Sequence, residues 1–276
     1  TEEMKNLGYQ VNILTHSEVK GDRISKWDPF KGELDLDFLE AADLVINLSG
    51  ENIACRWTNQ KKRKIRDSRI FSTRTLVKAI EKLQIKPTLF INASAIGYYG
   101  TQRQGELTED SASGEGFLAS VCKEWEEEAQ FVQAMGVRLV IPRIGTVISK
   151  EGGALKKMIP FFKWGLGGMI GEGRQWMSWI DLRDLVRLFL WMIQHEKIDG
   201  VINAVSPNPV TNREFTQILA STLHRPAWLS LPAFAARLLF DEMADEVLLH
   251  GSYVVPQKLQ DNGFMFEYPT LEKSLA

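Results

Sequence analysis

Residues 44–50 read Leu44-Val45-Ile46-Asn47-Leu48-Ser49-Gly50, an apolar run that passes into small and polar residues. A second run, Leu89-Phe90-Ile91, passes in the same way into Asn92-Ala93-Ser94. Neither run alternates between apolar and polar residues, as a strand with one solvated face would. Uninterrupted runs of this kind are typical of parallel strands that are covered on both faces. The sequence therefore predicts a buried parallel sheet.

The segments around these runs have helical periodicity. Residues 59–83 and 117–135 carry apolar side chains at helical spacing, and Gly136 follows the second segment where a left-handed residue is favoured. Strands that alternate with helices indicate βαβ units, so we expect an α/β fold with a doubly wound parallel sheet. Further strands are expected at residues 11–14, 24–27, 137–141 and 201–205, and further helices at 154–164, 184–195 and 211–223, with Asp184 as an N-cap.

Composition narrows the classes of partner. The chain has 276 residues, 44% of them hydrophobic and 25% charged, which is ordinary for a soluble domain. A formal net charge of −2 gives no electrostatic reason to expect nucleic acid or an anionic membrane as a partner. The basic run Lys61–Lys64, continued by Arg66 and Arg69, is interpreted as the solvated face of a helix.

The two cysteines, Cys55 and Cys122, have no CxxC spacing and no nearby histidine pair. Neither a disulfide framework nor a metal site is expected, and free thiols fit a reducing compartment. The apolar stretch Leu188–Ile193 is far shorter than the ~20 residues that span a bilayer. No signal-peptide pattern is visible, and we expect a cytoplasmic protein without a membrane partner.

The first residues have an unusual pattern. Thr1–Leu7 has helical composition, and Gly8 stands where a helix would end. So short a helix is marginal because nucleation is costly. We therefore expect a strand and the first part of this helix to precede Thr1, outside this sequence.

The tip of the first expected strand carries Thr15-His16-Ser17, with Lys20 and Arg23 beyond and Glu18 as the nearest acid. In doubly wound folds, ligands bind at the carboxyl ends of the strands. A carboxylate at this tip would favour NAD, whereas hydroxyl or basic residues accommodate the phosphate of NADP. The pattern favours NADP, and an ordinary polar turn remains the alternative interpretation.

A second polar cluster follows the run at residues 89–91. Ser94 comes at the end of a strand, and a turn with Tyr98 and Tyr99 follows. Such hydroxyls can polarise a carbonyl group and transfer a proton. Spacing alone is equally consistent with tyrosines that pack over the edge of the sheet, and both interpretations stay open.

Several short motifs follow one another in order along the chain. They are Asn47–Ile53, Arg56–Thr58, Asp67–Arg69, Ser94–Gly100, Trp125-Glu126, Pro142–Val147, Gly165–Gly168, Gly171–Gln175, Trp179–Asp181, Val205–Pro207 and the tail from His224. Together they resemble the atypical, epimerase-like short-chain dehydrogenase/reductases, also described as NAD-dependent epimerase/dehydratases or nucleoside-diphosphate-sugar epimerases. The resemblance covers essentially the whole chain.

The resemblance implies a Rossmann-type sheet with a smaller, helix-rich C-terminal substrate domain whose function is unknown. It places a dinucleotide-binding domain at residues 1–149, to which residues 176–205 return, and the smaller domain at 150–175 and 206–276. The implied activity is that of an NAD(P)-dependent epimerase-like oxidoreductase acting on a small molecule such as a nucleotide sugar. The helices at 59–83 and 117–135 pair in dimers of many relatives, so a homodimer is a further expectation.

The implied site combines the strand tips with the resemblance. Ser94 with Tyr98 or Tyr99 would be catalytic. The residues expected to bind the cofactor are Thr15, His16, Ser17, Leu48, Ser49, Gly50, Ser94, Lys123, Pro142 and Arg143.

The sequence departs from the family pattern in two places. A GGTGFIG-like loop, whose glycines admit the pyrophosphate, does not precede Thr1. Typical short-chain dehydrogenases also carry Tyr-x-x-x-Lys on one helix, but Ala119 stands four residues before Lys123. Lys123 is still expected to contact the ribose. The missing tyrosine motivates a competing hypothesis, a catalytically inert dinucleotide-binding module that senses redox state or regulates a partner.

Overall fold

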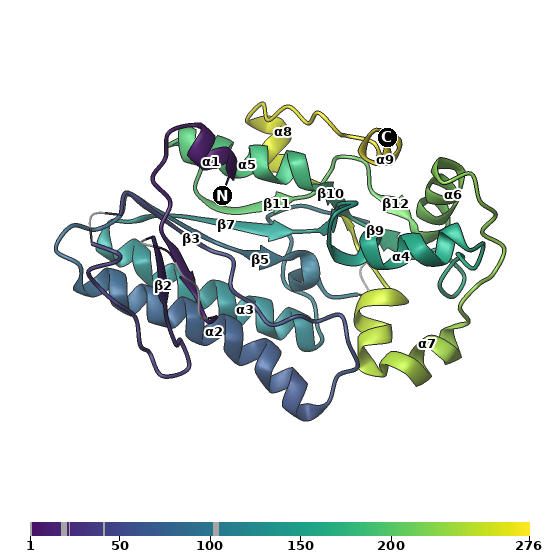
Figure 1. The fold of residues 1–276 in the computed structure, drawn as a ribbon, viewed down its shortest axis with the longest axis horizontal. Helices are drawn as coiled ribbons and strands as arrows, with labels where there is room; N and C mark the ends of the chain where they lie inside the picture. Colours follow the sequence, from purple (N-terminus) through teal and green to yellow (C-terminus); the bar gives the residue numbers. More distant parts are fainter. Residues whose placement is uncertain (1, 18–20, 22, 41, 102–104) are drawn as a thin grey trace.

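The computed structural model describes residues 2–17, 21, 23–40, 42–101 and 105–276. Its central sheet has the strand order β11-β7-β4-β3, with β5 also beside β7, and all of its pairings are parallel. These strands are β3 (Leu44–Asn47), β4 (Leu89–Asn92), β5 (Ser94–Ala95), β7 (Arg138–Ile144) and β11 (Gly200–Ala204). Figure 1 shows α2 (Asn59–Lys82) and α3 (Phe117–Gln130) on one face and α5 (Leu182–Gln194) on the other.

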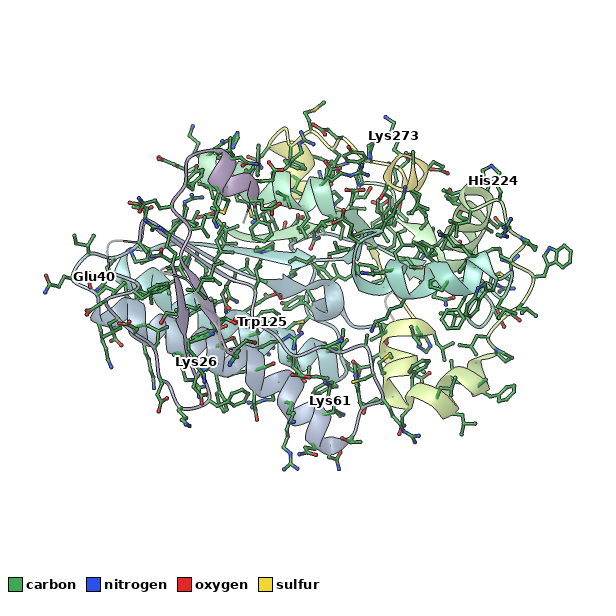
Figure 2. The ribbon with its side chains drawn as sticks, in the orientation of Figure 1. Lys26, Glu40, Lys61, Trp125, His224 and Lys273 are labelled. Atoms are coloured by element: carbon green, nitrogen blue, oxygen red, sulfur yellow. The ribbon has the colours of Figure 1, made fainter. Side chains whose placement is uncertain are left out.

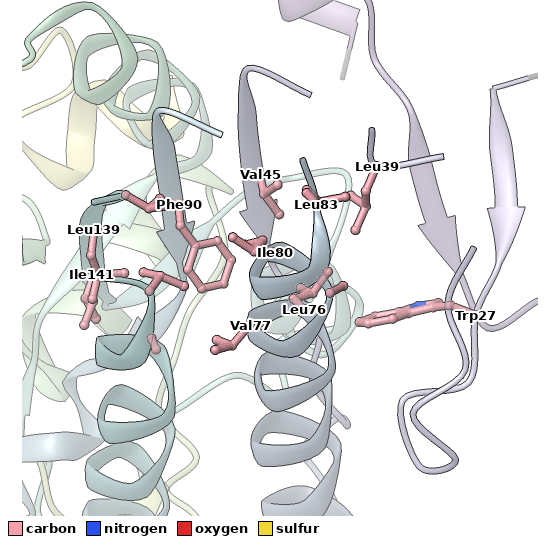
Figure 3. Close-up of a cluster of buried hydrophobic side chains, with 14 residues drawn as sticks. Trp27, Leu39, Val45, Leu76, Val77, Ile80, Leu83, Phe90, Leu139 and Ile141 are labelled. Atoms are coloured by element: carbon pink, nitrogen blue, oxygen red, sulfur yellow. The ribbon is translucent and has the colours of Figure 1, made fainter. Parts of the chain in front are cut away.

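The packing explains why the strands are apolar throughout. Successive side chains of a strand point to opposite faces of the sheet. Phe90 packs with Leu76 and Ile80 of α2 (Figure 3), whereas its neighbour Ile91 packs with Leu188 of α5. Both faces are therefore covered, and the predicted doubly wound parallel sheet is confirmed.

The helices begin and end close to the predicted positions. The hydroxyl of Thr58 caps α2 by accepting a hydrogen bond from the backbone N–H of Lys61 at 3.1 Å. The helix predicted at 117–135 is α-helical only to Gln130, and a 3₁₀ turn, η2 (Phe131–Met135), completes it. Gly136 then adopts φ 77°, the left-handed conformation that a helix end favours.

The prediction that Asp184 caps α5 is wrong. The helix begins at Leu182, and its N-cap is Asp181, whose carboxylate accepts from the backbone N–H of Arg183 at 2.7 Å. Asp184 is fully buried and accepts instead from the backbone N–H groups of Glu267 and Tyr268, at 3.0 and 2.8 Å. Asp184 therefore anchors the C-terminal segment to α5.

β1 (Ile13–Thr15) and β2 (Ile24–Lys26) form a separate two-stranded parallel sheet, and α1 (Glu2–Asn6) precedes them. Within the described ranges, neither strand pairs with β3. Lys20 and Glu18, two of the residues on which the predicted preference for NADP depends, lie outside the described residues.

Short elements complete the fold around residues 145–276. The strand pairs are β8 (Thr146–Ile148) with β10 (Trp179–Asp181), β9 (Trp176–Met177) with β12 (Val210–Thr211), and β6 (Glu106–Leu107) with β13 (Tyr253–Val254). The helices are α4 (Gly153–Lys163), α6 (Asn212–Thr222), α7 (Ala233–Phe240), the π-helical turn η3 (Ala244–Leu248), α8 (Gln257–Asp261) and α9 (Leu271–Leu275). None of the helices described is both long and apolar enough to cross a membrane.

Candidate functional site

The carboxyl ends of β3 and β4 are tied to the helices beneath them by buried polar side chains. Nδ2 of Asn47 donates to Oδ1 of Asn92 at 2.7 Å and to Oγ1 of Thr73 on α2 at 3.0 Å. The same Thr73 oxygen accepts from Nε1 of Trp125 on α3 at 2.9 Å; Trp125 is labelled in Figure 2. Because buried amides need partners, this network holds the loops that follow both strands.

Ser94 and Arg143, which the sequence predicts as site residues, meet through Glu126 of α3. Oγ of Ser94 donates to Oε1 of Glu126 at 2.6 Å. Arg143 donates to both carboxylate oxygens, from Nε at 2.8 Å and from Nη2 at 2.7 Å. The side chains of Arg143 and Glu126 are only 4% and 6% exposed, so this is a buried bidentate ion pair.

Arg143 also joins both predicted tyrosines to this cluster. Its Nη1 donates to the hydroxyl of Tyr99 at 3.0 Å, and that hydroxyl donates to Oδ1 of Asn203 on β11 at 2.7 Å. Its Cζ lies 3.3 Å from the centre of the Tyr98 ring, a close cation–π contact. We call Ser94, Tyr98, Tyr99, Glu126, Arg143 and Asn203 the strand-end cluster.

Burial and the charge of Glu126 shift the pKa values of two groups in this cluster. Burial opposes the charge of Arg143, but the hydrogen bonds and the negative charge of Glu126 outweigh it and raise the pKa of Arg143. Burial also raises the pKa of Tyr99, against the lowering influence of Arg143. Both groups therefore keep their protons at neutral pH.

The two tyrosines differ in access. Tyr99 is fully buried, and its hydroxyl is committed to Arg143 and Asn203. Tyr98 is half-buried, and its hydroxyl makes no hydrogen bond to any residue that the structure describes. Of the two phenols, Tyr98 is the one with a hydroxyl available to a ligand.

Helix α3 presents different residues to the cluster than expected. Gly97 lies against Leu118 and Cys122, because a Cβ at Gly97 would stand 3.2 Å from Cβ of Leu118 and 3.7 Å from Sγ of Cys122. Lys123, one residue further, is exposed and makes none of these contacts, while Ala119 is buried. The side chains of α3 that lie against Gly97 are thus Leu118 and Cys122, while Lys123 is open to solvent.

Burial raises the pKa of the Cys122 thiol to about 12, and the charge of Glu126 adds to the shift. Cys122 is therefore a neutral thiol at physiological pH and a poor nucleophile.

The loop segments predicted to hold the cofactor lie at strand ends. Thr15 ends β1, and its Oγ1 accepts from the backbone N–H of Ser17 at 3.2 Å, while the ring of His16 lies 5.7 Å from that of Trp27. His16 and Ser17 are both exposed, so each can contact a ligand.

The loop after β3 is also open to a ligand. Leu48 is 62% exposed, although it is apolar. The backbone N–H of Ser49 donates to Oδ1 of Asn47 at 3.1 Å, and Gly50 is exposed. An exposed leucine between a strand end and a glycine is consistent with a surface that a planar ring covers.

The sequence predicts that Pro142 and Arg143 directly follow a strand. In the structure they lie within that strand. β7 continues to Ile144, and Pro142 is buried opposite Ile202 of β11. Pairing with β4 ends at Val140 and resumes with β5 at Arg143. Pro142, which has no N–H, therefore lies at an interruption of the ladder, where its missing donor is tolerated.

Sequence reasoning missed three members or neighbours of the cluster. The sequence motifs include Glu126 without giving it a role, and they do not include Asn203 or Glu109. Asn203 had a readable signal, because it is the one polar residue inside the run Val201–Val205. Glu109 had none: it is buried, and its Oε1 accepts from the backbone N–H of Asn203 at 2.9 Å.

The C-terminal residues 240–248 contact the amino ends of α2 and α3. Both carboxylate oxygens of Glu246 accept from backbone N–H groups at the start of α3, from Phe117 at 2.6 Å and from Leu118 at 2.8 Å. Nζ of Lys62 donates to Glu242 at 2.8 Å, and Met243 packs into an apolar cluster. We call this contact the α3 cap contact.

The glycine-rich segment lines a pocket of about 270 Å³. Its walls come from α4 (Met158, Phe161 and Phe162), from residues 166–168 and Ile170, and from residues 229–231. A Cβ at Gly168 would overlap the carbonyl oxygen of Leu229, so only glycine allows this approach. Ser94 and Tyr98 are not among the lining residues, so this pocket and the strand-end cluster do not share a wall.

The basic run on α2 is not simply a solvated face. Lys61 pairs with Glu51, Lys62 with Glu242 and Arg66 with Glu124. Over the described part of the chain, no group of three or more His, Cys, Asp or Glu side chains could hold a metal ion.

The parallel sheet, covered on both faces and with polar side chains at its carboxyl edge, defines a Rossmann-type α/β protein. A model of the NAD dependent epimerase/dehydratase family matches residues 1–204, and a model of a domain of unknown function, DUF1731, matches residues 231–276. The chain therefore belongs to the NAD dependent epimerase/dehydratase family.

Named relatives agree with this assignment. The epimerase family protein ML0860 of Mycobacterium leprae is 42% identical over 91% of this chain and 81% of its own. The epimerase family protein YfhF of Bacillus subtilis is 40% identical over 98% and 89%. The crystal structure of human epimerase family protein SDR39U1 with NADPH superposes with a TM-score of 0.89 at 29% identity, covering 99% of this chain and 92% of that one.

Proposed function

We propose that this chain is an NADP-dependent, epimerase-like oxidoreductase that acts on a carbonyl or secondary hydroxyl group of a small molecule. The observation that carries the proposal is the strand-end cluster, which holds Tyr98 at the carboxyl edge of a Rossmann-type sheet with a phenol that no described residue engages in a hydrogen bond. The human relative crystallised with NADPH supports the choice of cofactor.

The residues present fit a dinucleotide. Two exposed strand-tip segments, at Thr15–Ser17 and Leu48–Gly50, offer hydroxyl groups, backbone N–H groups and an apolar surface. No carboxylate stands at Thr15, His16 or Ser17 to repel a 2′-phosphate, and His16 and Ser17 are exposed donors. This chemistry favours NADP over NAD.

The chain's own residues supply the proton chemistry. When bound, the nicotinamide supplies or accepts a hydride at the substrate carbon. Tyr98 donates a proton to the carbonyl oxygen in the reductive direction and accepts it back in the oxidative one. Arg143 orients the Tyr98 ring through the contact at 3.3 Å, and Ser94 and Tyr99 hold the Arg143–Glu126 pair in place.

The substrate is proposed to approach between residues 165–175, the C-terminal region and Tyr98. A nucleotide sugar is one candidate, in keeping with the epimerase family.

Cofactor binding is the first test. Titration of the protein with NADPH and with NADH, followed by nucleotide fluorescence, should give saturable binding that is tighter for NADPH. Ser17→Asp places a carboxylate beside the 2′-phosphate and should reverse the preference. The absence of saturable binding at high micromolar cofactor would overturn the proposal.

The competing proposal is a catalytically inert, dinucleotide-binding sensor. It is favoured by one observation: Lys123, the lysine of α3, is exposed and makes no hydrogen bond to Tyr98 in the described residues. Tyr98→Phe should leave NADPH binding unchanged and abolish turnover in a panel of carbonyl compounds and nucleotide sugars. Binding without turnover by the unmodified protein across that panel supports the sensor instead.

A further inference from the structure

Arg69 of α2 lies beside the loop that follows β3. Its Nη1 donates to the carbonyl oxygens of Glu51 at 3.2 Å and of Ile65 at 2.9 Å. A Cβ at Gly50 would stand 3.1 Å from both Cζ and Nη2, so the guanidinium lies directly against this glycine. Its Cζ is also 5.2 Å from the centre of the Trp125 ring on α3.

Arg69 is the exception among the arginines on its face of α2. Arg66 and Arg74 each reach across to an acid on α3, Glu124 and Glu128 respectively. Arg69 stands between them and has no carboxylate within ion-pair distance in the described residues. Glu51, the acid nearest to it in the loop, pairs with Lys61 instead.

One edge of this guanidinium is unused. Nη1 makes both hydrogen bonds, while Nε and Nη2 donate to no residue in the part of the chain that the structure describes. Arg69 is half-buried, and burial lowers the pKa of its guanidinium. A cation withdrawn from water and without a counter-charge favours an anionic or oxygen-rich ligand.

In the described residues, the part of α3 that lies against Gly97 carries no positive charge, and Arg69 could supply one. Leu118 and Cys122 face Gly97, and Lys123 is exposed. Arg69 acts electrostatically on the Cys122 thiol, so the guanidinium is close to the neutral stretch of α3 that faces the strand-end cluster. A positive charge is therefore available at this position, from α2 rather than from α3.

We propose that Arg69 is a cofactor-binding residue, whose Nε and Nη2 donate to the ribose hydroxyls and the adjoining phosphate of the nicotinamide half of the dinucleotide. This inference rests on the proposed function. The planar, two-donor edge of a guanidinium matches phosphate and vicinal oxygen atoms, and it lies between the Gly50 loop and the strand-end cluster, where that half of the cofactor would cross.

The test compares whole and half cofactors. NADPH and 2′,5′-ADP, the adenosine half of NADP, are titrated into the unmodified protein and into Arg69→Met, Arg69→Lys and Arg66→Met. Loss of a charge-assisted contact should raise the Kd for NADPH roughly ten- to hundredfold in Arg69→Met. The Kd for 2′,5′-ADP should stay within about twofold, because that half binds at the tip of β1.

The other variants separate charge from structure. Arg69→Lys keeps the charge and should recover part of the NADPH affinity, which also covers the case in which Arg69→Met does not fold. Arg66→Met removes a neighbouring arginine that is already paired and should change neither Kd. Thermal unfolding of each variant confirms that the titrations report on folded protein.

Two results overturn the inference. NADPH binding that is equal in Arg69→Met and the unmodified protein shows that the guanidinium does not touch the cofactor. Equal weakening of NADPH and 2′,5′-ADP assigns Arg69 to bracing the loop alone. Failure of the unmodified protein to bind any dinucleotide is a different outcome, since it overturns the proposed function and this inference with it.

Discussion

The strand-end cluster and the α3 cap contact use the same chemistry in different surroundings. In the cluster, Arg143 and Glu126 are 4% and 6% exposed. In the cap contact, Lys62 and Glu242 are 27% and 41% exposed, and the neighbouring pair Arg56 and Asp241 are 60% and 57% exposed. Both regions join segments that are distant in sequence.

Burial decides what each contact contributes. An exposed ion pair is screened by water and salt and contributes little. A buried pair is costly to form, but breaking it leaves an uncompensated charge in a medium that cannot solvate it. We therefore expect the cluster to tolerate almost no change, and the cap contact to respond mildly and in a salt-dependent way.

The largest effect is expected for Glu126→Gln. This change leaves Arg143 buried without a counter-charge and should lower the free energy of unfolding by about 3 kcal/mol or more. Urea denaturation measures the difference. The matched control is Glu127→Gln, because Glu127 is the adjacent, exposed residue on the same helix and should change stability by less than about 0.5 kcal/mol. Equal effects of the two changes would contradict the distinction drawn between buried and exposed charge.

The pH dependence of stability tests the effect of burial at Cys122. The folded thiol has a pKa of about 12 against an ordinary value of 9.0, so the unfolded chain loses this proton first. Its contribution to stability is complete below pH 9 and is lost as the pH rises toward 12, at about 1.4 kcal/mol per pH unit. The free energy of unfolding, measured between pH 8 and 11, should fall less steeply with pH in Cys122→Ala than in the unmodified protein. Identical slopes would refute the shift.

The cap contact should show a smaller effect in Glu246→Ala. The variant leaves two N–H groups of α3 without their acceptor and should cost about 1 kcal/mol, as for the loss of other N-terminal caps. Glu246→Gln keeps one acceptor oxygen and should cost less. A loss as large as that of Glu126→Gln would show that this contact is effectively buried.

The smallest effect is expected for the Lys62–Glu242 pair. A double-mutant cycle with Lys62→Met and Glu242→Gln should give a coupling free energy below about 1 kcal/mol, which 1 M NaCl should largely remove. A coupling that is insensitive to salt would mean that the pair is shielded from solvent.

Much of the fold was readable from local patterns. The runs at residues 44–48 and 89–91 form strands, and the helix predicted at 59–83 is α2 within one residue. These features depend on side-chain periodicity and helix ends, which are properties of short segments. The sequence predicts only part of the candidate site. Ser94 and Arg143 do come together, but the sequence analysis gives no role to Glu126, whose carboxylate joins them.

Helix geometry explains why two positions are difficult to interpret from the sequence alone. Successive residues of a helix point about 100° apart, so a shift of one position along α3 moves a side chain from the sheet to solvent. Cys122 lies against Gly97, whereas Lys123 is exposed. Likewise, Arg69 belongs to a basic run that is predicted to be solvated, but its guanidinium lies against Gly50 and near the ring of Trp125.

The sequence by itself determined the α/β class, the order of strands and helices and the membership of the epimerase family, because periodicity and ordered motifs lie along the chain. Only the tertiary structure decided that Glu126 pairs with Arg143 and, among the described residues, that the hydroxyl of Tyr98 rather than that of Tyr99 lacks a partner and that Nε and Nη2 of Arg69 have none. Those facts depend on which side chains from distant segments are buried together, since burial and hydrogen-bond partners set charge and access.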